Sequence, residues 1–138
     1  MDNIIIKKVY EDDHLIELRV QATAEFVNVH QFCYVQDTDL KDRAAAIVEY
    51  SNNYEESCYI EFGKKEGNYT PAFSLNFLKA DARGHVKIEA DIEIDDNEER
   101  KHRCCFYMKS ELGMVEQFGK ALKRLVSAEI DTEIKLHW

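Results

Sequence analysis

Acidic side chains are the residues whose spacing in this sequence points most directly to a chemical role. From 81 to 99 there are eight acids and two bases, a local net charge of −6 in a chain whose formal charge is −9. A concentrated negative field attracts basic surfaces, so we expect part of this run to steer or dock a basic partner. The residues expected to do so lie on one strand or in the loop after it: Glu89, Asp91, Glu93, Asp95, Asp96, Glu98 and Glu99.

The acidic run also has a simpler interpretation, because a charged and solvated sheet face discourages edge-to-edge aggregation. Several bases follow the run directly, and cross-strand ion pairs with them could neutralise part of its charge. These bases are Arg100, Lys101, Arg103 and Lys109. If the acids dock a basic partner, reversing several of their charges should slow association, whereas a merely solvated face should leave the kinetics unchanged.

Residues suited to catalysis are present, but their spacing matches no common catalytic motif. The sequence has no GxSxG elbow, glycine-rich phosphate loop, HExxH helix or DxDxDG calcium loop. The five histidines are scattered, and the best thiol–imidazole pair is His102 with Cys104, which share one face of an expected strand. We therefore expect a protein that is not an enzyme and has no catalytic, cofactor or metal site.

The four cysteines form no CxxC pair and mostly lie in apolar stretches, which is typical of buried free thiols. The adjacent Cys104 and Cys105 should point to opposite faces of a strand, which disfavours a bond between them or a shared metal. The sequence thus predicts free thiols and no zinc site.

Length and composition favour one globular domain. The 138 residues can bury one ordinary core, and no apolar run approaches the roughly 20 residues that span a bilayer, so no membrane partner is expected. The first residues lack a basic stretch followed by an apolar one, so we expect no signal or transit peptide and a cytoplasmic location. The net charge of −9 would repel a phosphate backbone, so nucleic acid is not an expected partner.

Alternation of apolar and polar residues predicts the strands that would position the acids. The clearest strand is 85–94, where five apolar residues face one way and four charged residues face the other. We expect a bend within 25–35, which has no single apolar face, and a bulge or strand end at Leu78. The tail 130–138 alternates again and could add an edge strand or dock on a partner. Further strands are expected at 4–10, 16–22, 25–35, 57–62, 72–79 and 101–108.

Two segments have helical spacing instead. Residues 38–50 place four apolar side chains on one stripe, and Asp37 or Thr38 can cap the start of this helix. In residues 110–128, apolar side chains recur every three or four positions, and Ser110 can cap the start of this helix. Two glycines inside this second helix should each cost roughly 1 kcal/mol relative to alanine.

Short connections determine how the strands must pair. Residues 81–84 are a turn candidate and 95–99 a charged loop, and tight connections join antiparallel neighbours, whereas parallel neighbours need a crossover of about a dozen residues. The sequence predicts a single α+β domain over 1–138. Its architecture is expected to be a twisted antiparallel sheet of about five to seven strands packed against one or two helices.

Several of these segments together are similar to a known family. The segments are the run LIELRV at 15–20, the helix at 38–50, FSLNF at 73–77, RGHVKIEA at 83–90, the aromatic strand end at 106–108 and the final helix. Over about 14–126 they resemble the WapI-type immunity proteins, small cytoplasmic bacterial proteins that protect a cell from a wall-associated, contact-delivered toxin.

The resemblance implies a role in binding and carries over no functional residue position by position. It implies that the chain captures and neutralises a cognate toxin domain, often a nuclease, without catalysis. A nuclease presents cationic residues to phosphate, so an acidic inhibitor has the complementary field. Exposed aromatic residues should supply most of the binding energy. The candidates are Tyr54, Tyr59, Tyr69 and Trp138.

Two other classes of function stay open. A small-molecule binder would enclose an apolar pocket with unfilled volume, lined by Phe73, Phe77 and Ile88. An oligomerisation module would pair the tail 130–138 between two copies, so the chain is expected to be a monomer or a homodimer.

Overall fold

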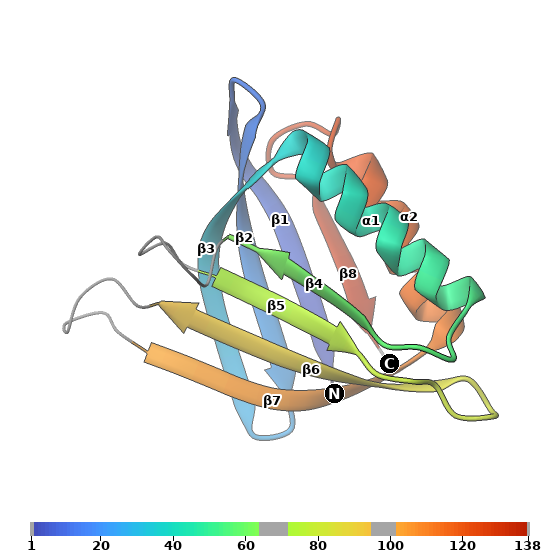
Figure 1. The fold of residues 1–138 in the computed structure, drawn as a ribbon. Helices are drawn as coiled ribbons and strands as arrows, with labels where there is room; N and C mark the ends of the chain where they lie inside the picture. The colour runs from blue at the N-terminus through green and yellow to red at the C-terminus, as the bar shows by residue number, and fades with distance from the viewer. Residues whose placement is uncertain (1, 64–71, 95–101, 138) are drawn as a thin grey trace.

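The strands form two antiparallel sheets of four strands each in the computed structural model, which describes residues 2–63, 72–94 and 102–137. The first sheet has the strand order β3-β2-β1-β8, and the second sheet has the order β4-β5-β6-β7 (Figure 1). The elements follow one another along the chain as β1 (Asn3–Asp12), β2 (Leu15–Ala24), β3 (Val27–Gln36), α1 (Asp37–Asn52), β4 (Cys58–Phe62), β5 (Ala72–Phe77), β6 (His85–Ile94), β7 (His102–Glu111), α2 (Leu112–Leu125) and β8 (Glu133–His137).

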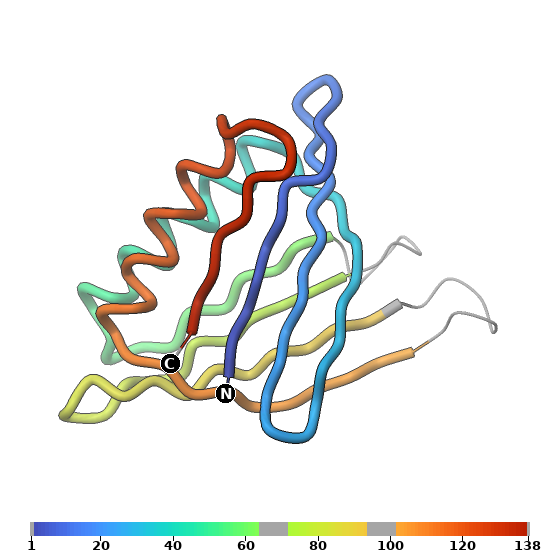
Figure 2. The backbone as a smooth tube through the Cα atoms, turned by 180° about the vertical axis from the view of Figure 1, so that it is seen from behind, coloured from blue at the N-terminus to red at the C-terminus, as the bar shows by residue number. Residues whose placement is uncertain are grey.

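Each helix carries the chain from one sheet to the other. Helix α1 connects β3 to β4, and α2 returns the chain from β7 to β8, which pairs with β1 (Figure 2). The two helices pack side by side across the open side between the sheets (Figure 1). Gln31 of β3 links the sheets directly, because its side-chain amide donates to the carbonyl oxygens of Ala72 (2.7 Å) and Glu93 (3.3 Å).

Inward-facing side chains of both sheets and both helices form one apolar core. Alternate residues of β2 from Ile16 to Ala22 are buried, as are alternate residues of β6 from Val86 to Ile92. Helix α2 adds its apolar stripe, in which Phe118 is 1% exposed. Burying apolar surface stabilises a fold by about 25 cal/mol per Å². The alternation read from the sequence therefore fixes which face of each sheet points inward.

The two helices approach each other closely at Gly119. A Cβ atom on this residue would lie 2.9 Å from the Cγ2 atoms of Ile47 and Val48 on α1. Gly113 lies on the exposed side of α2, and its Cβ position has nothing within 4 Å. Glycine has a low helix propensity, which lowers the stability of α2 at both positions. At Gly119 this loss is offset by the close packing that the missing side chain permits, whereas Gly113 permits no such packing.

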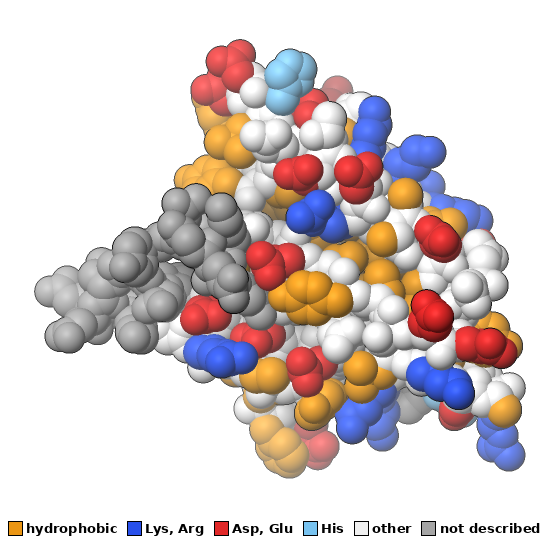
Figure 3. Space-filling view, in the orientation of Figure 1, with side chains coloured by type: hydrophobic (Ala, Val, Ile, Leu, Met, Phe, Trp, Pro, Cys, Tyr) orange, Lys and Arg blue, Asp and Glu red, His pale blue; other side chains and the backbone are white. Residues whose placement is uncertain are grey.

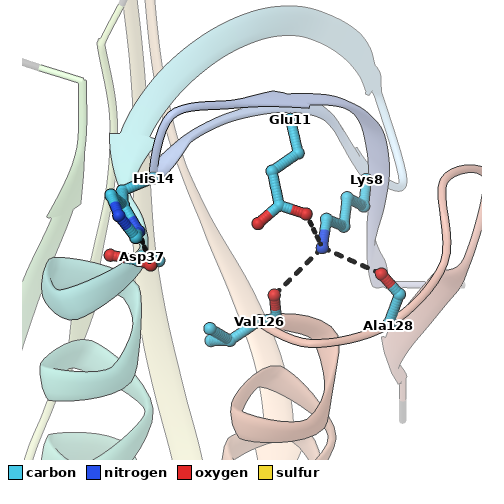
Figure 4. Close-up of polar contacts among 6 residues, drawn as sticks. All are labelled: Lys8, Glu11, His14, Asp37, Val126 and Ala128. Carbon is cyan, nitrogen blue, oxygen red and sulfur yellow. Dashed lines mark hydrogen bonds and ion pairs between the residues drawn. The ribbon is translucent and has the colours of Figure 1, made fainter.

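A buried lysine ties the first sheet to the end of α2 (Figure 4). Lys8 is fully buried, and its ammonium donates to the carbonyl oxygens of Val126 (2.9 Å) and Ala128 (2.8 Å). The same Nζ atom lies 2.9 Å from a carboxylate oxygen of Glu11. The last carbonyls of a helix carry partial negative charge and need hydrogen-bond donors. Lys8 supplies these donors from the strand that faces the helix end.

The predicted fold class is confirmed, but the strand count and sheet number are not. The structure is α+β with antiparallel pairing, and it has eight strands in two sheets where the sequence predicts about five to seven in one. The tail supplies β8, which is the edge strand next to β1 of the same chain. Strand β5 ends at Phe77, just before the irregularity expected at Leu78. The predicted charged loop at 95–99 lies outside the described residues.

The segment 25–35, in which a bend is expected, contains no bulge. Strand β3 pairs with β2 over its whole length without a register shift, because residues 25–26 belong to the preceding turn. The irregularity lies in β1, whose register with β2 shifts between Lys8 and Tyr10. One extra residue in one strand is the signature of a bulge.

The predicted helix caps are also wrong. Helix α1 has Gln36 at its N-cap and α2 has Glu111, and neither side chain makes a capping hydrogen bond. Asp37 instead accepts a hydrogen bond from the N–H of Thr38. Ser110 cannot cap α2, because β7 runs directly into that helix and Ser110 is still a buried strand residue.

Candidate functional site

The outward face of the second sheet carries the acids that the sequence singles out. The strand register places Glu89 opposite Tyr107 and Glu93 opposite Arg103, with Asp91 between them. Glu61 of β4 lies two strands away, in the same row as Asp91. Acidic side chains gather on the face turned to the viewer in Figure 3, and we refer to Glu61, Glu89, Asp91 and Glu93 as the acidic face. The other predicted acids lie outside the described residues: Asp95, Asp96, Glu98 and Glu99.

Asp91 differs from its neighbours because an arginine covers it. Asp91 is 6% exposed, and its Oδ2 accepts a hydrogen bond from Arg103 Nη2 at 2.8 Å. Arg103 Nε donates to the second carboxylate oxygen at 3.3 Å. The hydrogen bond and charge of Asp91 raise the pKa of the Arg103 guanidinium. The charge of Asp91 is thus compensated within the sheet, and Asp91 is the least accessible of the predicted docking residues in the described part of the chain.

Two exposed tyrosines flank the acidic face. The register forms one row across all four strands, from Tyr59 through Asn76 and Glu89 to Tyr107. Tyr59 is 55% exposed and Tyr107 is 51% exposed. The Glu89 carboxylate, through a hydrogen bond and its charge, raises the pKa of the Tyr107 phenol. Lys87 adds a cation 4.2 Å from the centre of the Tyr107 ring.

Tyr107 was not among the aromatic candidates, although a signal for it existed. Tyr107 lies two residues after Cys105 in an alternating strand, so both side chains point to the same face. This is the outward face, on which β6 carries Glu89 and Asp91. Among the sequence candidates, Tyr59 lies on this face and Tyr54 lies in the connection between α1 and β4. Tyr69 and Trp138 lie outside the described residues.

Charge on this outward face is distributed along the strands. Lys87 and Lys109 lie opposite each other on one side of Glu89, and Arg103 lies opposite Glu93 on the other side. The four carboxylates of the acidic face are thus accompanied by three cations. The cross-strand neutralisation expected from the bases that follow the acidic run therefore applies at least to Asp91.

A groove of about 1310 Å³ follows the outer edge of β7. Residues 106–110 of β7 form one wall, and residues 24–27 at the turn between β2 and β3 form the opposite wall. Asp2 and the segment that leads from β5 into β6 complete the lining, which includes Lys79 and His85. Apolar atoms dominate this lining, and Phe26 at the turn is 89% exposed.

The residues expected to line an internal ligand pocket are packed in the core instead. The Phe73 ring stacks on Phe62 with their centroids 5.9 Å apart, and the Phe77 ring lies 5.6 Å from that of Tyr50. A void beside Ile88 is too small to hold a water molecule. The three predicted lining residues are thus buried among other side chains of the core.

None of the four cysteines forms a disulfide, and they are not equally buried. Cys33 is fully buried, and desolvation raises its pKa to about 12. Cys104 and Cys105 point to opposite faces, as expected, because they pair with an inward and an outward residue of β6. The expected burial is wrong for Cys105, which is exposed on the outward face. His102, the predicted partner of Cys104, is exposed on the same strand.

Within the described ranges, no group of three or more His, Cys, Asp or Glu residues could hold a metal ion.

Comparisons of this chain with protein-family models, with curated proteins and with solved structures find no match. In the part of the chain that the structure describes, no helix is long and apolar enough to cross a membrane. The fold defines an α+β protein with two antiparallel sheets joined by two crossover helices. The acidic face and the groove are therefore the two features of the described surface that bear on function.

Proposed function

We propose that this chain is a non-catalytic cytoplasmic immunity protein that binds and neutralises a cognate toxin domain through the acidic face. The observation that carries this proposal is the row of side chains from Tyr59 to Tyr107, in which two exposed aromatic rings flank the Glu89 carboxylate. The resemblance of the sequence to the WapI-type immunity proteins supports the same role.

Aromatic rings and carboxylates would contribute differently to such a complex. Tyrosine combines a large apolar ring with a hydroxyl, and tyrosines supply a large share of the binding energy in protein interfaces. Carboxylates at the rim of an interface act mainly on the rate of association with a cationic partner. A toxin that acts on nucleic acid needs cations at its active site, so the acidic face offers it both complementary charge and anchoring rings.

The direct test is binding to the candidate partner. The C-terminal domain of a large secreted protein encoded beside this chain is titrated with the chain by calorimetry, at low and at physiological salt. We expect tight, one-to-one binding that weakens as salt rises, because the docking charges are screened. The absence of binding by a correctly folded partner domain would contradict the proposal.

Charge reversal locates the surface. We expect the double variant Glu89→Lys and Glu93→Lys to slow association about 10-fold, because it removes the attraction that steers the partner. The matched control reverses Glu129 and Glu133, which are exposed elsewhere and give the same change in net charge. An equal slowing by both double variants would point to overall charge and exclude the acidic face as the docking site.

Aromatic substitution tests the anchoring role separately. Tyr59→Ala and Tyr107→Ala should each raise the dissociation constant at least about 10-fold, mainly through faster dissociation. Tyr54→Ala is the matched control, since Tyr54 is also exposed but lies outside the row. Unchanged dissociation in both row variants would remove the tyrosines from the interface.

A further inference from the structure

The outer edge of β7 offers main-chain hydrogen-bonding groups to the groove. In the described part of the chain, β7 pairs with β6 on one side and ends the second sheet on the other. The groove is lined by five consecutive β7 residues, 106–110, so side chains of both faces and the main chain between them border it. A wall made of consecutive strand residues is the wall that an added strand requires.

A carboxylate of this chain already binds that edge. The backbone N–H of Lys109 donates to Oδ2 of Asp2 at 2.8 Å, and therefore points away from β6. In an antiparallel ladder, alternate residues direct their N–H groups to the same side. Tyr107, two residues before Lys109 and in an unbroken register with β6, thus directs its N–H toward the same side as Lys109. The Asp2 contact shows the kind of acceptor that this edge binds.

The remaining lining selects the chemistry of an occupant. Phe26, on the wall opposite β7, offers an almost fully exposed aromatic ring, and the partly buried Phe106 adds apolar surface to the β7 wall. Lys79 and Lys87 also line the groove, and neither forms an ion pair with another described residue. The Asp81 carboxylate at the same end is already bound to the N–H groups of residues 83 and 85. The lining also holds the exposed carboxylate of Glu25, on the wall opposite β7. The groove therefore favours apolar side chains along its length and acidic side chains at the end formed by Lys79 and Lys87.

We propose that the groove binds an extended peptide segment of a partner protein, which adds to β7 as a fifth strand of the second sheet. The segment hydrogen-bonds to the main chain at Tyr107 and displaces the Asp2 carboxylate from Lys109. Its apolar side chains lie against Phe26, and its acidic side chains lie near Lys79. This site does not depend on the proposed toxin-binding role, because it uses main-chain groups at a sheet edge and not the carboxylates of the acidic face.

The test uses a synthetic peptide and the full chain. An acetylated and amidated eight-residue peptide of alternating valine and glutamate is titrated into the isotope-labelled protein, and amide hydrogen exchange is measured by NMR. Valine favours the extended conformation, and glutamate supplies the acidic groups. We expect slower exchange of the Tyr107 amide on binding. The control peptide has the same sequence with N-methyl groups on alternate residues, so it cannot complete the strand pairing, and it should bind at least about 10-fold more weakly.

Two substitutions in the groove test the proposal, because one should tighten peptide binding and the other should weaken it. Asp2→Ala should tighten peptide binding about fivefold by clearing the Lys109 N–H, and Phe26→Ala should weaken it about 10-fold by removing an exposed apolar contact. Ile130→Ala is the matched control, because Ile130 is exposed at a distant turn. The proposal is overturned if neither the native chain nor Asp2→Ala binds the peptide, or if the N-methylated peptide binds equally well. The variant with Glu89→Lys and Glu93→Lys should keep its peptide binding, which separates this site from the acidic face.

Discussion

The two sheets contain the same number of strands but direct their polar groups in opposite ways. The first sheet points Lys8 into the molecule, where its ammonium binds the end of α2. The second sheet points its carboxylates outward and covers only Asp91, by means of Arg103. A buried charge needs its partners for the fold to be stable, whereas an exposed charge remains available to another molecule. The buried charge of the first sheet is therefore part of what stabilises the fold, whereas the exposed carboxylates of the second sheet remain accessible from outside.

The largest expected difference between the sheets is in the reactivity of their thiols. At pH 8, Cys105 on the second sheet should react with an aromatic disulfide reagent more than about 1000-fold faster than Cys33 on the first, because a buried thiol reacts only after the fold opens. Burial also raises the Cys33 pKa to about 12, so almost none of it is thiolate at that pH. Stopped-flow absorbance measures both phases. Cys105→Ser should abolish the fast phase, and loss of that phase in Cys33→Ala instead would reverse the assignment.

The next largest effect is expected at Lys8. Lys8→Met leaves two carbonyl oxygens at the end of α2 without their donor, and should lower the free energy of unfolding by about 3 kcal/mol. Urea unfolding at pH 7 measures the loss. Lys7→Met is the matched control on the same strand, because the Lys7 side chain is 34% exposed and its ion pair with Asp131 is 3.7 Å long. The control should lose less than about 1 kcal/mol. Equal losses in the two variants would contradict a special role for Lys8.

The helix layer that joins the two sheets provides a third test. Gly119→Ala places a methyl group 2.9 Å from side-chain atoms of α1, and should lower the free energy of unfolding by about 2 kcal/mol. Gly113→Ala, in the same helix with open space at its Cβ position, should raise that free energy by up to about 1 kcal/mol. Opposite signs in urea unfolding are the expected result. A stabilising Gly119→Ala would show that the helices can separate at no cost.

The smallest effect concerns an exposed aspartate–histidine pair at the start of α1 (Figure 4). The His14 ring lies 3.0 Å from the Asp37 carboxylate, and their hydrogen bond holds the pKa of Asp37 below its ordinary value of 3.8. A lowered folded-state pKa contributes stability that is present above pH 3.8 and is lost as the pH falls through the folded-state pKa. Asp37→Asn should therefore lower the melting temperature at pH 7, and the difference from the native chain should shrink below pH 3.8.

Asp39→Asn is the control for this pH dependence. Asp39 lies in the same first turn of α1, so its substitution removes the same charge near the helix start without removing the His14 contact. Melting temperatures are measured from pH 7 to pH 2 for both variants. Identical profiles for the two variants would attribute the effect to helix-terminal charge and not to the pair with His14.

Alternation predicts individual strands well because burial imposes it directly on the sequence. The strand at His85–Ile94 was predicted with its observed bounds, and both helices and the edge strand in the tail were found. The number of sheets could not be predicted in the same way, since alternation says which face of a strand is buried and not which strand lies beside it. The separation into two sheets follows from the crossovers that α1 and α2 make between them.

The candidate site was predicted in part. The outward direction of Glu89 and Glu93 follows from alternation, but the burial of Asp91 depends on where the Arg103 side chain lies across the strand. Lys8 falls in phase with the buried Ile6, which was a signal for an inward charge, although its partners at the end of α2 are more than a hundred residues away in sequence. The groove could not be predicted, because it arises where a turn of one sheet meets an edge of the other.

The pairing of β1 with β8 has a consequence for synthesis on the ribosome. The first three strands emerge early, but the strand that completes their sheet, and the carbonyls that satisfy Lys8, belong to the last part of the described chain. Until these residues emerge, the nascent chain exposes the edge of β1 next to an unpaired ammonium. Contacts between distant segments form slowly, and exposed strand edges can pair with other chains. Assembly of the first sheet is therefore completed only after residues 133–137 have been synthesised, and the interval before that is when a chaperone would act on the chain.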